Sequence, residues 1–94
     1  MKIKRILWLE SIVEKLAQKH SIQQHEVLEV LSNNPHFRFV EKGFRSGENV
    51  YTAMGQTFGG RYLIVFFVFK KSDQALILSA RDMTQSERAK YEQR

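Results

Sequence analysis

Cysteine is absent from this chain of 94 residues. Its absence excludes disulfide bonds, zinc sites built on thiolates and a cysteine nucleophile, and it is typical of the reducing cytoplasm, where we expect the protein to act. Long hydrophobic runs are also absent: the longest, from Tyr62 to Phe69, is far shorter than the roughly 20 residues that cross a membrane. Only Ile6–Leu9 separate the basic start Met1–Arg5 from Glu10, too short a stretch for the apolar segment of a signal peptide. We therefore expect no membrane partner.

Proline occurs once, and no repeat or low-complexity tract interrupts the chain, so we expect one domain over residues 1–94. A hydrophobic fraction of 43% and an aromatic fraction of 12% are sufficient for one compact core. Acidic residues are outnumbered, because 10 Asp and Glu stand against 15 Lys and Arg, for a formal net charge of +5. Such a chain favours a polyanionic partner, either nucleic acid or an acidic protein, although a lysine-rich solvated surface is the ordinary alternative.

Three stretches carry the S/T-x-x-E/Q pattern of a helix capping box. They are Ser11–Glu14, Ser21–Gln24 and Thr84–Glu87. The first two predict helices with an apolar face, the first ending near His20 and the second before Pro35, because proline excludes the helical region for its predecessor. The helix after Thr84 has few apolar residues, so we expect the core to hold it only weakly.

Most of the remaining chain is rich in β-branched and aromatic residues and is punctuated by turn residues, which predicts strands. The predicted strands are Phe37–Val40, Val50–Gly55, Arg61–Phe69 and Gln74–Ala80, with Lys4–Trp8 as an additional edge strand. The nearly continuous apolar run of the third indicates a central strand covered on both faces. We therefore predict an α+β fold, in which two N-terminal helices and one C-terminal helix pack on a small antiparallel sheet.

Several short motifs resemble those of one protein family. They are Trp8 with Lys19-His20, the hairpin Gly55–Tyr62, and Ser79-Ala80-Arg81 with Glu87, Arg88 and Tyr91. In type and spacing these residues resemble the BrnT family of bacterial toxins, ribonucleases of type II toxin–antitoxin pairs with a RelE/ParE-like fold. The resemblance implies an endoribonuclease that cleaves mRNA, inhibits translation and is neutralised by a cognate antitoxin. A homodimer within the toxin–antitoxin complex is a further option.

Three positions depart from the family pattern. The family usually has an aspartate where this chain has Leu9, a polar residue in place of Leu16 and a glycine in place of Ser21. These departures favour an alternative of another class, a non-catalytic module with the same fold that binds an antitoxin or nucleic acid. A relative that poisons a topoisomerase is a third option.

Metal-independent cleavage of RNA uses the 2′-hydroxyl of the substrate as nucleophile. The protein must then supply a base for that proton, cations for the charged phosphorane and an acid for the departing 5′-oxygen. Arginine suits the second role, because its planar fork donates two hydrogen bonds to phosphate oxygens. The candidates are Arg61, Arg81 and Arg88. Each has an ordinary alternative role. Arg61 could be a charge at a strand end, and Arg81 could pair with Asp82 or cap a carbonyl. Arg88 could be a surface charge paired with Glu92.

His20 is the predicted acid or base, because imidazole titrates near neutral pH. Its alternative role is to cap the C-terminus of the first helix. We interpret His25 and His36 as incidental. The spacing of the three histidines matches no metal-binding motif, so we predict neither a metal site nor a cofactor.

Four further residues are candidates for binding nucleic acid: Lys19, Lys42, Arg45 and Tyr91. Arg45 belongs to a loop bounded by glycines, which suits a contact with a flanking phosphate. Tyr91 shares a helix face with Arg88, where it either stacks on a base or attaches the helix to the sheet. We predict that the arginines and His20 converge on one solvent-open hollow that holds a single phosphodiester.

Overall fold

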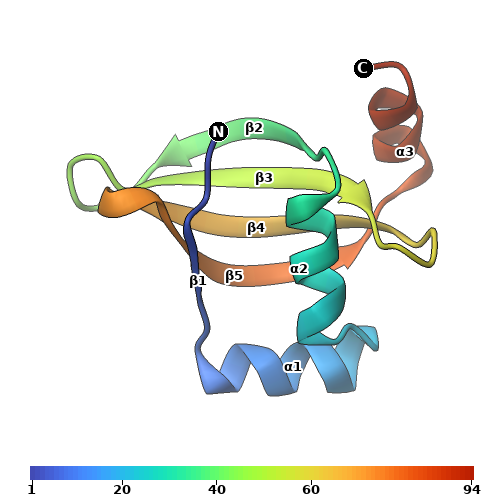
Figure 1. Ribbon diagram of the computed structural model, residues 1–94, viewed down its shortest axis with the longest axis horizontal. Helices are drawn as coiled ribbons and strands as arrows, with labels where there is room; N and C mark the ends of the chain where they lie inside the picture. Colours follow the sequence, from blue (N-terminus) through green and yellow to red (C-terminus); the bar gives the residue numbers. More distant parts are fainter.

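The computed structural model describes residues 1–94 and contains three helices and five strands (Figure 1). In chain order the elements are β1 (Arg5–Leu7), α1 (Glu10–His20), α2 (Gln24–Ser32), β2 (His36–Lys42), β3 (Asn49–Gln56), β4 (Tyr62–Lys70), a 3-10 turn (Lys71–Asp73), β5 (Gln74–Asp82) and α3 (Gln85–Glu92). None of the helices is long and apolar enough to span a membrane. The predicted α+β class, with two helices before the main strands and one after them, is confirmed.

The strands form one sheet in the order β1-β5-β4-β3-β2. The pairs β2–β3, β3–β4 and β4–β5 are antiparallel as predicted, whereas β1 joins the edge parallel to β5. The short β1 pairs only with Gln74–Leu76, so the C-terminal half of β5 has β4 on one side and no strand on the other. The unpaired edge of β5 ends at Asp82, the last residue of the strand that precedes α3.

Helices α1 and α2 cover one face of the sheet, where α2 packs on β3 and β4 and α1 packs on β5 (Figure 1). Alternate residues of β4, namely Leu63, Val65 and Phe67, point into this layer and are fully buried, as the period of two in a strand requires. The helices and the loop between them add Leu16, Ile22, Val27 and Val30. Each of these side chains contributes roughly 1.5–3 kcal/mol by leaving water, so this layer is the main source of stability.

The opposite face of the sheet is covered only at one end, by α3. Tyr91 of α3 is 6% exposed and packs with Met54 and Ile64, whereas Phe66 and Val68 remain half-buried. A helix of eight residues is only about 12 Å long, which is too short to cover the sheet. The prediction that β4 is covered on both faces is therefore only partly right, because part of this face stays open to solvent.

The helix starts show where local sequence patterns mislead. The capping box at Thr84 and Glu87 is confirmed, with both reciprocal hydrogen bonds present. The box predicted at Ser11 is wrong, because α1 begins at Glu10 and Leu9 occupies its N-cap without any side-chain hydrogen bond. The second box is built by Gln23 and Glu26, because Ser21 already serves as the C-cap of α1 in the left-handed conformation (φ 52°).

Candidate functional site

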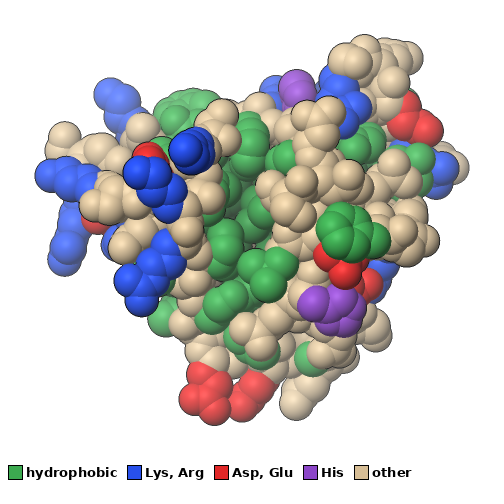
Figure 2. Space-filling view, in the orientation of Figure 1, with side chains coloured by type: hydrophobic (Ala, Val, Ile, Leu, Met, Phe, Trp, Pro, Cys, Tyr) green, Lys and Arg blue, Asp and Glu red, His purple; other side chains and the backbone are tan.

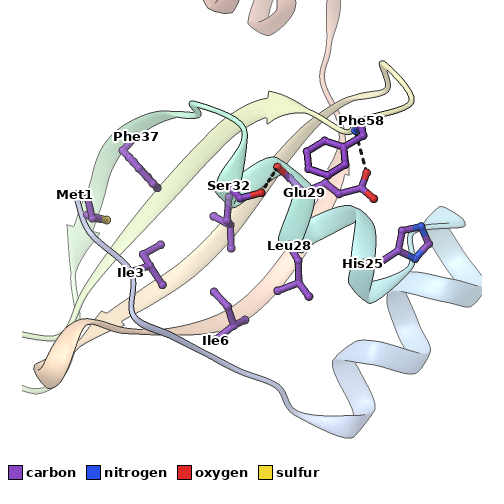
Figure 3. Close-up of a pocket in the computed structure, with 10 residues that line it drawn as sticks. Met1, Ile3, Ile6, His25, Leu28, Glu29, Ser32, Phe37 and Phe58 are labelled. Atoms are coloured by element: carbon purple, nitrogen blue, oxygen red, sulfur yellow. Dashed lines mark hydrogen bonds between the residues drawn. The ribbon is translucent and has the colours of Figure 1, made fainter.

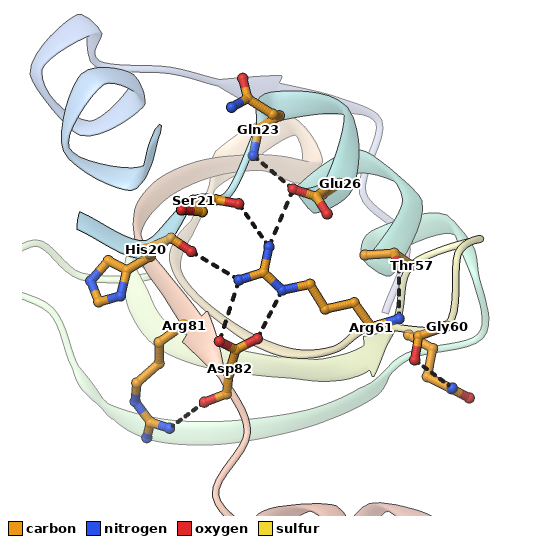
Figure 4. Close-up of polar contacts among 10 residues, drawn as sticks. His20, Ser21, Gln23, Glu26, Thr57, Gly60, Arg61, Arg81 and Asp82 are labelled. Carbon is orange, nitrogen blue, oxygen red and sulfur yellow. Dashed lines mark hydrogen bonds and ion pairs between the residues drawn. The ribbon is translucent and has the colours of Figure 1, made fainter. Parts of the chain in front are cut away.

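Arg61 lies just before β4 and connects three elements at one end of the sheet (Figure 4). Its Nε and Nη2 donate to the two carboxylate oxygens of Asp82 at 2.8 and 3.3 Å. Its Nη2 also donates to the carbonyl of His20 at 2.8 Å, and its Nη1 donates to the carbonyl of Ser21 at 2.7 Å. Nη1 lies 3.5 Å from Oε1 of Glu26 as well. One guanidinium therefore ties together the end of α1, the start of α2 and the end of β5.

These contacts occupy every donor that Arg61 has, since a guanidinium carries five N–H groups. The pKa of Arg61 is raised, chiefly by the hydrogen bond to Asp82, and the same bond lowers the pKa of the Asp82 carboxyl. No N–H remains for a phosphate. These contacts favour a structural role for Arg61, that of holding the loop that carries His20, and its predicted catalytic role stays a prediction.

Arg81 immediately precedes Asp82 in β5, so the two side chains point to opposite faces of the sheet. Its Nη1 and Nη2 donate to the carboxylate of Glu87 at 2.7 and 2.9 Å, and Nη1 also donates to the carbonyl of Asp82 at 3.2 Å. The guanidinium lies 5.6 Å from the centre of the Phe66 ring. These hydrogen bonds lower the pKa of Glu87 to about 2, mainly because Arg81 stabilises the ionised carboxylate.

The pairing with Glu87 uses only one edge of the Arg81 guanidinium. Glu87 takes the Nη1/Nη2 fork, and Nε makes no hydrogen bond at all. No buried side-chain nitrogen or oxygen in the protein lacks a partner, so the unpaired Nε of this half-buried residue is reached by solvent. The Nε/Nη2 edge of Arg81 therefore remains available to a phosphate, and it is the same edge with which Arg61 grips Asp82.

Arg81 borders a hollow of about 330 Å³ on the face that α3 leaves uncovered. We call it the sheet-face hollow; its lining comprises Arg38, Phe39, Val40, Thr52, Met54, Ile64, Phe66, Arg81, Glu87 and Lys90. Three cations and one carboxylate surround it, and the carboxylate is already engaged by Arg81. The hollow therefore carries a net positive charge over a largely apolar floor, a combination that suits an anionic ligand with a flat ring.

Three of the four predicted catalytic residues gather at Asp82 (Figure 4). Arg61 binds its carboxylate, Arg81 donates to its carbonyl, and the charge of His20 helps to lower the pKa of its carboxyl. His20 is half-buried, and its imidazole makes no hydrogen bond within the protein (Figure 4). These three residues are thus neighbours of Asp82, but they do not converge on one hollow as predicted: Arg61 and Arg81 lie on opposite faces of the sheet, and Arg81 alone of the four predicted catalytic residues lines the sheet-face hollow.

Arg88 is not part of this group. Its guanidinium stacks on Tyr62 at 3.9 Å from the ring centre, and Nε lies 3.6 Å from Glu92, as the predicted surface pair requires. Lys90, two residues further along α3, lies about 200° around the helix from Arg88 and faces the sheet-face hollow. The flank of α3 that borders the hollow therefore presents Lys90 in place of the predicted Arg88.

The residues predicted to bind nucleic acid do not form one surface. Tyr91 is buried against Tyr62, with ring centres 6.0 Å apart, which favours its alternative role of attaching α3 to the sheet. Lys19 is exposed on α1 beside His20. Lys42 and Arg45 lie in and beside the β2–β3 loop, at the opposite end of the sheet from α3, where basic side chains cluster (Figures 1 and 2).

A second, larger hollow of about 570 Å³ lies between the N-terminal segment and α2 (Figure 3). Its lining is mainly apolar, and hydrophobic side chains are visible along it in the space-filling view (Figure 2). Its titratable side chains are His25 and Glu29, and no lysine or arginine lines it. This hollow lacks the cations that a phosphate requires, so the smaller sheet-face hollow is the better candidate for RNA.

The other histidines stay apart from His20. His25 is exposed on α2, and His36 is the first residue of β2. No group of three or more His, Asp or Glu side chains is close enough to hold a metal ion.

Sequence reasoning missed Arg38 and Lys90. A signal for Arg38 was present, because it alternates with Phe37 and Phe39 in a strand and so must face away from their layer. Lys90 carried a weaker signal, its position three residues after Glu87 on one helix face. Neither pattern indicates that the two side chains border one hollow, because that depends on how α3 folds back over the sheet.

Comparison with known proteins adds independent information. Residues 8–87 match the model of a family described as the ribonuclease toxin BrnT of type II toxin–antitoxin systems. The structure is similar to the 1.1 Å crystal structure of the Brucella abortus ribonuclease toxin BrnT, with a TM-score of 0.60 and 19% sequence identity over 89% of this chain and 100% of that chain. A comparison with the sequences of curated proteins finds no match. The structural likeness, at this identity, supports the fold.

Proposed function

The chain belongs to the BrnT family of ribonuclease toxins of type II toxin–antitoxin systems, and from this premise we propose that it cleaves mRNA without a metal ion and thereby inhibits translation. Cleavage takes place at the free edge of β5, where His20 and Arg81 gather at Asp82. The other predicted catalytic residue of this group, Arg61, acts by positioning the loop of His20.

The Arg81 guanidinium and the His20 imidazole supply different functions in the reaction. The Nε/Nη2 edge of Arg81 donates two hydrogen bonds to non-bridging phosphate oxygens and stabilises the charge that develops on the phosphorane. Glu87 holds the adjacent Nη1/Nη2 edge, so the guanidinium is already oriented before the substrate arrives. His20 exchanges the proton of the 2′-hydroxyl or of the departing 5′-oxygen, since its imidazole has no competing hydrogen bond.

The observation that carries this proposal is the unpaired, solvent-reached edge of Arg81. Arg61 has no such edge, because its five N–H groups are all engaged within the protein. A guanidinium that keeps a bidentate edge free beside a positively charged hollow is arranged for an external oxyanion.

The three departures from the family pattern lie at structural positions. Leu9 is the N-cap of α1, Ser21 is its C-cap, and Leu16 is a core residue that is 2% exposed. None of the three side chains borders the sheet-face hollow. Their changes therefore bear on the stability of α1, and they give little support to the alternative of a non-catalytic module.

A type II toxin has a protein antitoxin as its partner, and the family assignment implies one for this chain. We further propose that the RNA substrate is mRNA in the cytoplasm, the compartment expected for a chain without cysteine. A homodimer within the toxin–antitoxin complex stays a prediction.

The test is cleavage of a 5′-labelled RNA by purified protein, with and without EDTA. We expect the wild type to cut in both conditions and Arg81→Ala to lose activity while its thermal unfolding stays cooperative. Arg5→Ala is the matched control, because Arg5 is an exposed arginine on β1 outside the hollow. Full activity of Arg81→Ala would overturn the site, loss of cleavage in EDTA would overturn the metal-independent mechanism, and a folded wild type that cuts nothing would favour the non-catalytic module.

A further inference from the structure

We propose that the sheet-face hollow is a binding track for single-stranded RNA, in which Arg38 and Lys90 hold phosphates flanking the one at Arg81 and Phe66 supports a base. The proposal rests on the proposed ribonuclease function for its choice of ligand. It adds three residues, from β2, β4 and α3, to which neither the family pattern nor the predicted site gave a role.

The strand register places these residues in two adjacent rows. Arg38, Thr52, Phe66 and Ser79 are neighbours across β2, β3, β4 and β5, and Arg81 lies in the next row beside Ile64. Arg38 and Arg81 are thus rooted on opposite sides of the hollow, roughly 14 Å apart across three strand spacings. Lys90 reaches the same hollow from α3. The three cations therefore surround an elongated space, which suits a chain of phosphates better than one isolated anion.

Arg38 and Lys90 are free to bind a ligand. Both are exposed, and neither forms an ion pair or a side-chain hydrogen bond, in contrast to Lys4 and Lys70, which are paired with acidic residues. Uncompensated cations that face one hollow repel each other, and a polyanion relieves this repulsion while releasing its own counterions.

The floor of the hollow distinguishes RNA from other polyanions. The accessible part of the apolar floor under the cations is half-buried Phe66, because Met54 and Ile64 are buried against Tyr91, and the Arg81 guanidinium lies 5.6 Å from the centre of the Phe66 ring. A flat base placed on this surface gains from stacking whatever its sequence, as in other proteins that bind single strands. An acidic peptide would satisfy the cations and leave this floor unused.

The test measures binding of a fluorescein-labelled 2′-O-methyl RNA by fluorescence anisotropy over a range of salt concentrations. The methyl group blocks the attacking hydroxyl, so binding is measured without cleavage. We expect Arg38→Ala and Lys90→Ala each to weaken binding and to lower the slope of log K against log salt by about 0.7, the value for one phosphate contact on a single strand. Phe66→Leu should weaken binding roughly fivefold or more with an unchanged slope, because it removes stacking and no charge.

Arg5→Ala serves as the control for a lost surface cation and should keep both the affinity and the slope of the wild type. Slopes for Arg38→Ala and Lys90→Ala equal to that of the wild type would overturn the track, and cleavage of unmodified RNA by the wild type would then still support the proposed function. Binding with the expected slopes and no cleavage would support the track and overturn the proposed function. Competition by poly-glutamate as effective as that by unlabelled RNA would overturn RNA as the ligand in favour of an acidic protein segment.

Discussion

Arg61 and Arg81 lie at the same end of the sheet and differ in their surroundings: Arg61 lies just before β4, three residues before Ile64, which pairs with Arg81 of β5. Arg61 faces the layer of α1 and α2, where the carbonyls at the end of a helix and two carboxylates surround it. Arg81 faces the half-covered side, where a single carboxylate meets it and one edge stays free. The surroundings of an arginine, more than its presence near a strand end, decide whether it can serve a substrate.

The comparison also explains why α3 remains in place despite its small apolar surface. Tyr91 supplies the buried anchor, Arg94 stacks on its ring and donates to the carbonyl of Asn34 at 2.8 Å, and Glu87 pairs with Arg81. The Arg81–Glu87 ion pair therefore helps to attach the helix, and in our proposal it also orients Arg81 for a phosphate.

The largest expected effect is on catalysis by Arg81. We expect Arg81→Ala to lower the rate of RNA cleavage about 10²–10³-fold, the usual cost of removing one donor to a developing oxyanion. Arg81→Lys should recover little of this loss, because an ammonium cannot pair with Glu87 and offer a second bidentate edge at the same time. Single-turnover cleavage of labelled RNA checks the prediction, and near-complete rescue by lysine would show that only charge is needed.

Substitution of Arg61 should show the reverse pattern, with a large loss of folding stability and a small effect on the rate of RNA cleavage. Arg61→Ala leaves the Asp82 carboxylate and the carbonyls of His20 and Ser21 without their donor, so we expect the free energy of unfolding to fall by about 2 kcal/mol. Urea unfolding measures this change. Cleavage by the fraction that remains folded should stay within about tenfold of the wild type, well above Arg81→Ala. A stable Arg61→Ala protein that is inactive would reverse the roles of the two arginines.

The Arg81–Glu87 pair makes a specific prediction for acid stability. The pKa of Glu87 falls from 4.5 to about 2 on folding, so its ionised form stabilises the protein fully above pH 4.5 and loses this effect as the pH falls towards 2. Glu87→Gln should therefore be less stable than the wild type by about 1 kcal/mol at neutral pH, after allowance for solvent screening, and the difference should disappear near pH 2. Urea unfolding at several pH values tests this, and a difference independent of pH would show that the charge is not responsible.

The smallest effects concern the caps of α1. Leu9→Asp should raise the free energy of unfolding by about 1 kcal/mol, because an aspartate at the N-cap accepts a hydrogen bond from the first turn. Ser21→Gly should add up to about 1 kcal/mol, since glycine adopts the left-handed conformation without strain. Thermal unfolding measures both changes. Neither substitution should alter the specific cleavage activity, and a large gain of activity in either would mean that these departures had weakened the catalytic site itself.

Much of the fold could be predicted from the sequence, because it depends on local patterns. The strands follow from period-two and continuous apolar runs, and the third capping box follows from Thr84 and Glu87. The sequence failed at Ser11 and Ser21, where the same four-letter pattern occurs without the backbone conformation that a capping box needs. Ser21 could not start α2 because it was required to end α1.

The residue types of the site were also readable from the sequence, since a strand end with arginines and a histidine near a helix C-terminus are local features. The sequence does not show which arginine keeps one edge of its guanidinium free of hydrogen bonds. The partners that occupy Arg61 lie 21 and 41 residues away along the chain, and those distances close only when β5 and the end of α1 meet in the folded protein. The partners of a hydrogen-bond donor depend on contacts in three dimensions. The sequence by itself therefore determined the helices, the strands and the chemical groups of the site. The tertiary structure alone decided that Arg38, Arg81 and Lys90 face one hollow, while Arg61 holds the fold.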